Sequence, residues 1–189
     1  MQTEAIVTRL LQCCVPLMHA NRWRALRDVV VSAVGGKALA LTALALGTRR
    51  ATSLRHRVKC VDRLLANGHL ESERLNAYRA LAHAWLGKVP QLLIVVDWSS
   101  LTADLQWHWL RASVVVDGRS VTLYEEVHAR QHLGARKVHR KFIERLASVL
   151  PVSTQPPIIL TDAGFRTPWF RLIARQGWTW IGRTRNRDF

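Results

Sequence analysis

The apolar residues change their period near Pro90, and this change constrains the fold more than any other feature. Before Pro90 they recur at the three- and four-residue spacing of amphipathic helices. After it, Leu92–Val96 is a continuous apolar, β-branched run, which is typical of a strand buried on both faces. The helices are expected over residues 3–18, 22–34, 37–46 and 71–87. The sequence therefore predicts a helical region over residues 1–88 and a strand-containing domain over residues 89–189.

The second region alternates between strand and helix patterns. Strands are expected over residues 92–96, 107–116, 120–128, 158–160 and 178–181, and helices over residues 135–150 and 167–175. The resulting order is βββαβαβ. An antiparallel start followed by alternating helices and strands predicts an α/β domain with a mixed sheet, and this layout resembles the ribonuclease-H-like fold.

The charge of the chain favours a polyanionic partner. Lys and Arg number 28 against 13 Asp and Glu, which gives a formal net charge of +15. The excess is spread along the chain and is densest over residues 48–65, which carry Arg49, Arg50, Arg55, Arg57, Lys59 and Arg63. Three helices leading into a basic helix resemble helix-turn-helix modules, whose basic side chains neutralise DNA phosphates. Double-stranded DNA is the expected partner, and a solvated helix face is the alternative reading.

Cysteine usage and hydropathy indicate a cytoplasmic protein. Cys13, Cys14 and Cys60 form neither an even disulfide framework nor the paired spacing of a zinc site, which fits a reducing compartment. The most apolar run, residues 38–46, is too short to cross a bilayer, so no membrane association is expected.

Two aspartates stand at the ends of short apolar strands. Asp97 follows Leu92–Val96, and Asp162 follows the strand expected over residues 158–160. If these strands are neighbours, the two carboxylates could together bind Mg²⁺ or Mn²⁺. Two such ions would stabilise the attacking and leaving oxygens of a phosphoryl displacement. For Asp162, the capping of a turn or of the following helix is the structural alternative.

Three segments resemble the bacterial insertion-sequence transposases of the IS-four group, which belong to the DDE superfamily. They are the basic segment His56–Asn67, the segment Val95-Val-Asp-Trp-Ser99 and the segment Leu160-Thr-Asp-Ala-Gly-Phe165. The resemblance implies that Asp97 and Asp162 are the first two metal-binding carboxylates of a DDE triad. It also implies that residues 49–63 grip transposon-end DNA, that two copies can assemble on it, and that the protein is associated with the nucleoid.

The third carboxylate of that triad cannot be assigned. In the family it is a Glu in a helix with a Tyr-Arg-Glu-Lys type of signature, and no such signature occurs in this sequence. The expectation is therefore a truncated transposase with impaired DNA cleavage and strand transfer. Two alternatives stay open: a non-catalytic DNA-binding protein that inhibits transposition, and a nuclease that completes its site with another acid such as Glu126.

Overall fold

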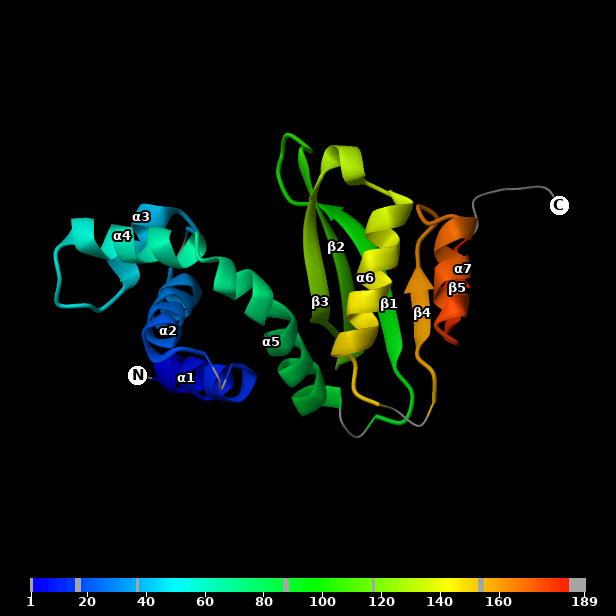
Figure 1. The fold of residues 1–189 in the computed structure, drawn as a ribbon, viewed down its shortest axis with the longest axis horizontal. Helices are drawn as coiled ribbons and strands as arrows, with labels where there is room; N and C mark the ends of the chain where they lie inside the picture. The colour runs from blue at the N-terminus through cyan, green and yellow to red at the C-terminus, as the bar shows by residue number, and fades with distance from the viewer. Residues whose placement is uncertain are drawn as a thin grey trace. The chain divides into compact units, whose positions relative to one another are not determined.

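The computed structural model describes residues 2–15, 18–36, 38–86, 89–116, 118–152 and 155–183 (Figure 1). The chain divides into two compact units, one of residues 1–80 and one of residues 81–189. The division falls inside helix α5 (Gly68–Leu86). The boundary expected between residues 88 and 89 lies just beyond the end of that helix.

The first unit is helical, as the apolar spacing predicts. Besides the first part of α5, its helices are α1 (Gln2–Cys14), α2 (Ala20–Gly35), α3 (Leu41–Gly47) and α4 (Leu54–Leu65). The helix expected over residues 37–46 begins at Leu41, and Lys37 lies outside the described residues. Helix α4 begins after Ser53, whose hydroxyl oxygen accepts the His56 N–H at 3.4 Å and so satisfies one of the free donors of the first turn.

Helices α2, α3 and α4 share one small apolar core. Its buried residues are Leu44, Ala45 and Val61, and Val29, Ala33, Leu41 and Val58 pack against them. Helices α2 and α3 approach closely at Gly47, where any side chain would collide with Ser32. The Ser32 hydroxyl donates to the Leu44 carbonyl at 2.8 Å. A glycine at position 47 is therefore a packing requirement of this unit.

Two arginines of the basic stretch hold these helices together. Arg50 Nε lies 2.7 Å from Asp28 Oδ2, which connects the segment before α4 to α2. Arg57, in α4, donates to the Thr48 carbonyl at 3.0 Å, just past the end of α3. Both side chains are half-buried. Their positive charges serve the fold of the unit.

The second unit is built on a five-stranded mixed sheet in the order β3-β2-β1-β4-β5. Its strands are β1 (Leu93–Ser100), β2 (Trp107–Val116), β3 (Arg119–Ala129), β4 (Ile158–Thr161) and β5 (Thr179–Gly182). Strands β1 to β3 form antiparallel pairs, whereas β1 with β4 and β4 with β5 are parallel. The expected order of elements is thus present. Strand β1 runs further than expected, so Asp97 lies inside it and not after it.

Helices α6 (Arg136–Val149) and α7 (Thr167–Arg175) pack against each other, and each contacts the sheet (Figure 1). A short 3₁₀ turn, η1 (Arg130–His132), precedes α6. The largest fully buried side chains between these layers include Trp169, Tyr124, Phe142, Leu110 and Ile159. Side chains on the other face of the sheet are half-exposed, such as Leu93 at 47% and Val127 at 45%. The described helices of this unit therefore cover one face of the sheet.

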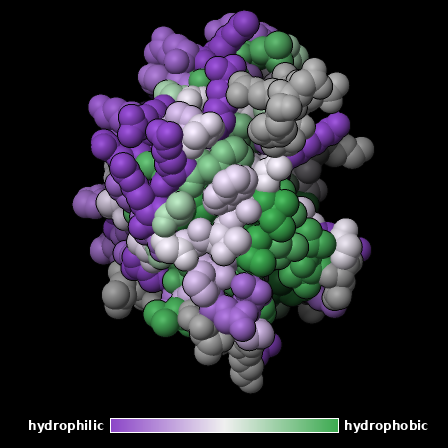
Figure 2. All heavy atoms as spheres, turned by 90° about the vertical axis from the view of Figure 1, so that its right-hand side faces the viewer, coloured by the Kyte–Doolittle hydropathy of each residue, from purple (hydrophilic) through white to green (hydrophobic). Residues whose placement is uncertain are grey.

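The surface around α7 and β5 carries both hydrophilic and hydrophobic side chains. Figure 2 views the molecule from the side on which these two elements lie in Figure 1, and it shows hydrophilic residues gathered on one part of the surface and a hydrophobic patch on another. Trp180 and Ile181 of β5 are exposed apolar residues. Within the described ranges, no helix has both the length and the apolar character needed to cross a membrane.

The ion pair between Arg50 and Asp28 should contribute to the stability of the first unit. Replacement Arg50→Met removes the charge but keeps most of the side-chain length, and it takes from the partly buried Asp28 one of its two ion pairs, leaving the one with Arg27. We expect a loss of about 1–2 kcal/mol in the free energy of unfolding, measured by urea denaturation with far-ultraviolet circular dichroism. The matched control is Arg55→Met in the exposed face of α4, expected to change stability by less than about 0.5 kcal/mol. Equal effects of the two substitutions would contradict the structural role of Arg50.

Candidate metal centre

The parallel pairing of β1 with β4 brings the two predicted aspartates to one edge of the sheet. The register pairs Val96 with Thr161, and these are the last paired positions of the two strands. Asp97 and Asp162 are the residues that follow immediately. The pairing of β1 with β4 stops at this level, although β1 continues beside β2 to Ser100, so the two carboxyl groups follow neighbouring positions of the sheet. Both side chains are exposed.

Asp97 is held on the face of β1 that α6 and α7 do not cover. Its Oδ2 atom accepts a hydrogen bond from the Ser99 hydroxyl at 2.9 Å, and the two residues share a face because side chains alternate along a strand. The ladder places Arg111 opposite Asp97 and Glu125 opposite Arg111. Arg111 binds Glu125 at 3.0 Å and lies over the Trp109 ring at 4.5 Å. An arginine with two fixed partners therefore lies next to Asp97.

Asp162 begins a tight turn after β4. Its Oδ1 atom accepts the Gly164 N–H at 2.9 Å, and its carbonyl oxygen accepts the Phe165 N–H at 3.5 Å. A Cβ atom at position 164 would lie only 3.1 Å from Asp162 Oδ1, which makes glycine the best fit there. Helix α7 begins after Arg166, which makes no side-chain capping bond. Asp162 thus caps the turn and not the helix, and the turn fixes the orientation of its carboxyl group.

The donor set of this pair fits a hard divalent cation. Each carboxylate has one oxygen in a local hydrogen bond and one oxygen that no described residue hydrogen-bonds. Mg²⁺ prefers oxygen ligands, keeps several of its waters and is commonly held by one or two carboxylates. Among the residues that the structure describes, no group of three His, Cys, Asp or Glu side chains is arranged to hold a metal ion. The candidate centre therefore consists of two carboxylates.

Glu126 lies on the opposite face of the sheet from Asp97. The ladder pairs it with Leu110, and Leu110 with Trp98, so it faces α6. Its carboxylate accepts hydrogen bonds from the Tyr124 hydroxyl at 2.6 Å and from Arg145 at 2.7 Å, and it lies 2.8 Å from His128 Nε2. Although burial opposes ionisation, these three partners hold the pKa of Glu126 below its usual value. These contacts account for a buried carboxylate at this position: Glu126 joins β3 to α6 through Arg145.

A histidine that the sequence reasoning missed connects the two aspartate-bearing segments. His139 Nε2 accepts a hydrogen bond from the Trp98 indole N–H at 3.1 Å. The same imidazole stacks on Phe165, with ring centroids 5.5 Å apart, and meets the edge of Trp169 at 4.9 Å. Burial, with the nearby charge of His128 as a second cause, lowers the pKa of His139 to about 4. His139 is therefore neutral near pH 7, as its acceptor role requires.

Its position in the sequence carried a signal for this role. His139 precedes Phe142 by three residues and Leu146 by seven, which is the spacing of one helix face. Phe142 and Leu146 are fully buried. A histidine on the apolar face of α6 therefore required a partner inside the fold, but its identity depended on long-range packing that periodicity does not reveal.

The six basic residues predicted to contact DNA divide into two groups. Arg50 and Arg57 have the internal partners Asp28 and the Thr48 carbonyl, whereas Arg49 is exposed and its ion pair with Glu4 is long, at 3.7 Å. The remaining three are exposed and follow one another at four-residue spacing on α4. They are Arg55, Lys59 and Arg63. Because residues four apart share a helix face, they form one basic stripe.

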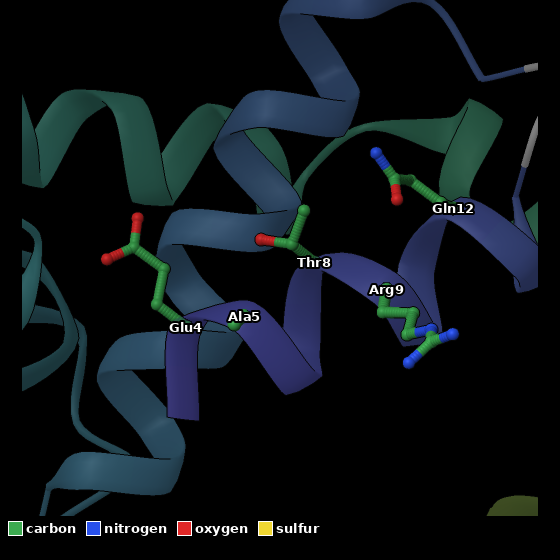
Figure 3. Close-up of a pocket in the computed structure, with 5 residues that line it drawn as sticks. All are labelled: Glu4, Ala5, Thr8, Arg9 and Gln12. Atoms are coloured by element: carbon green, nitrogen blue, oxygen red, sulfur yellow. The ribbon is translucent and has the colours of Figure 1, made fainter. Parts of the chain in front are cut away.

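Two hollows of the described surface are not lined by Asp97 or Asp162. Figure 3 shows one along α1, lined by Glu4, Ala5, Thr8, Arg9 and Gln12. The Glu4 carboxylate in this hollow forms the ion pair with Arg49. Another hollow is lined by Leu92 and Pro157, which precede β1 and β4 and so lie at the opposite ends of these strands from the two aspartates. The hollow along α1 has one carboxylate, and the hollow beside Leu92 and Pro157 has none.

Comparison with known proteins points to one family. The family model described as a transposase DDE domain matches residues 89–188. No curated protein and no solved structure matches the chain.

The low pKa of His139 predicts an acid-sensitive second unit. In the unfolded chain this histidine gains its proton near pH 6.5, but in the folded protein only near pH 4. Its stabilising contribution is therefore complete above pH 6.5 and is lost as the pH falls toward 4. Between these values the wild-type protein should lose about 2–3 kcal/mol more unfolding free energy than the His139→Gln variant. Tryptophan-fluorescence denaturation at several pH values measures this, and parallel pH profiles of the two proteins would contradict it.

Proposed function

Because the chain belongs to the family of transposases with a DDE domain, we propose that it cleaves and joins DNA strands at transposon ends, with Asp97 and Asp162 as the metal-binding carboxylates. The observation that carries this proposal is the neighbouring position of the two aspartates, each of which directly follows the last paired residue of β1 and β4. Membership of the IS-four group is part of the same proposal, supported by the two aspartate motifs and the basic helix before them.

The residues at the strand ends suit this chemistry. Bound there, a pair of Mg²⁺ or Mn²⁺ ions would stabilise the attacking and leaving oxygens of a phosphoryl displacement. Asp97 is oriented by the Ser99 hydroxyl, and Asp162 by the N–H of Gly164. Because each carboxylate already has a fixed direction, binding an ion costs less side-chain ordering.

Basic side chains at the same edge of the sheet support a DNA substrate. Strand β3 runs in the same direction as β1, since both are antiparallel to β2, so α6 begins at the edge where β1 and β4 end. The exposed residues there are Arg136, Lys137 and Arg140 of α6 and Arg166 before α7. Four cations at this edge of the sheet, of which Arg140 lies 4.0 Å from Glu144, would attract a phosphate backbone toward the edge.

The first unit supports a second DNA contact. Helices α3 and α4 pack on α2 around one small core, and the basic stripe of α4 is exposed. We propose that this unit is a helix-turn-helix-like module in which α4 contacts double-stranded DNA. Arg55, Lys59 and Arg63 are the contact residues, whereas Arg50 and Arg57 act through the fold.

The carboxylate pair is tested by metal uptake and DNA nicking. Calorimetric titration should show that Asp97→Asn and Asp162→Asn each weaken Mn²⁺ binding by at least tenfold, because one of two charged ligands is lost. Nicking of a transposon-end duplex with Mn²⁺ should fall in both variants to the level of DNA without protein. We expect slow nicking by the wild-type chain, since the described residues supply two carboxylates and no third ligand.

Glu126→Gln is the control for this experiment. It removes a carboxylate from the same sheet, on the other face, and should leave Mn²⁺ uptake unchanged while lowering stability. If the wild-type chain binds DNA but takes up Mn²⁺ no better than the two aspartate variants, the non-catalytic inhibitor of transposition becomes the better reading. Loss of uptake in Glu126→Gln as well as in the two aspartate variants would instead favour the nuclease that completes its site with Glu126.

The DNA contact of α4 is tested by salt dependence. Each phosphate contact contributes about −0.9 to the slope of log affinity against log salt. The double substitution Arg55→Gln with Arg63→Gln should therefore make the slope shallower by about 2, measured by fluorescence anisotropy with duplex DNA. The matched control removes two exposed arginines from other helices of the same unit, Arg9→Gln with Arg24→Gln, and should leave the slope nearly unchanged. Equal slopes for the two double variants would refute α4 as the contact helix.

A further inference from the structure

The two proposed metal ligands belong to segments that are far apart in the sequence but touch the same imidazole. His139 lies in the first half of α6, with 7% of its surface exposed. On one side it accepts the indole N–H of Trp98, the residue after Asp97. On the other side it stacks on Phe165, whose own N–H donates to the carbonyl oxygen of Asp162.

From these contacts we infer that Trp98 and His139 are positioning residues, which hold the Asp97 and Asp162 segments in the relation that lets both carboxylates share a metal ion. The inference rests on the proposed function, because it assigns a task toward the ion that the two carboxylates would hold. It adds two residues, neither of which would touch that ion.

The hydrogen bond of Trp98 controls how β1 is rotated at its end. Adjacent side chains of a strand point to opposite faces, so fixing the Trp98 indole toward α6 fixes Asp97 on the other face. An indole N–H is a single directed donor, and His139 Nε2 gives it one acceptor inside the fold. The Trp98 ring also meets the edge of His128 at 5.7 Å. The strand end therefore has little freedom to turn, although Asp97 itself is exposed.

The aromatic contacts of His139 fix the turn that carries Asp162. Phe165 and Trp169 are buried, at 6% and 1% exposed, and their ring centroids lie 4.7 Å apart. His139 contacts both rings. Since Phe165 ends the turn that begins at Asp162, a shift of the Phe165 ring would displace that turn. One side chain of α6 thus couples the two strand ends.

The experiment compares Mn²⁺ affinity in conservative variants of the full chain, measured by electron paramagnetic resonance of the free ion. Trp98→Phe keeps a ring but removes the donor, and His139→Leu keeps an apolar side chain but removes the acceptor. Both should weaken Mn²⁺ binding roughly tenfold, the effect typical of residues that orient metal ligands. His139→Gln keeps an acceptor at a similar reach and should restore affinity to within about threefold of wild type.

Tyr124→Phe is the matched control. It removes a buried hydrogen bond from the same sheet, the one from Tyr124 to Glu126. Its Mn²⁺ affinity should equal that of the wild type, and circular dichroism should show every variant folded.

The outcomes separate this inference from the proposed function. If wild type and Asp97→Asn bind Mn²⁺ equally weakly, the carboxylate pair is not a metal site and both ideas are overturned. If Asp97→Asn loses binding but Trp98→Phe and His139→Leu bind as wild type does, the proposed function stands and the positioning role is refuted. A loss in Tyr124→Phe as large as that in Trp98→Phe would also refute it, because the effect would then reflect general destabilisation.

Discussion

The parallel pairing of β1 with β4 is the constraint on which the second unit depends. Ile94 and Val96 on one strand and Ile159 and Thr161 on the other form a buried set facing the helices. A slip of one residue would turn the side chains of β4 to the opposite face and expose Ile159. Burial of apolar surface therefore fixes the register, and the register determines which residues follow the last paired positions. The neighbouring position of the two acids is a consequence of core packing several residues before them.

Local patterns in the sequence were sufficient to predict the helices and strands, but not which of them lie side by side. The β-branched run before Asp97 and the helical spacing around Phe142 predicted the order βββαβαβ, because both patterns are short-range. That β1 lies beside β4 could be stated only as a condition, since Asp162 follows Asp97 by 65 positions. The hydrogen bond from Trp98 to His139 could not be foreseen, because it depends on where α6 packs on the sheet.

For the basic residues too, the sequence did not reveal which side chains have partners inside the fold. Charge alone treats Arg50 and Arg55 as equivalent, yet Arg50 meets Asp28, twenty-two residues earlier in the chain, whereas Arg55 is exposed on α4. A strongly positive sequence thus contains two populations of arginine. One neutralises buried carboxylates and stabilises the helices, and the other remains available to a polyanion. Only the second population should respond to salt, so net charge overstates the number of side chains that can reach DNA.

The turn after β4 has a consequence for the choice of ion. With Oδ1 of Asp162 engaged by Gly164 and Oδ2 of Asp97 engaged by Ser99, each carboxylate offers its remaining oxygen. If the pair binds an ion as we propose, coordination through these two oxygens would be monodentate, which suits small octahedral ions, whereas the larger Ca²⁺ accepts bidentate carboxylates and more ligands. Discrimination by ionic radius would therefore arise from a backbone amide and a serine hydroxyl, neither of which needs to coordinate the ion.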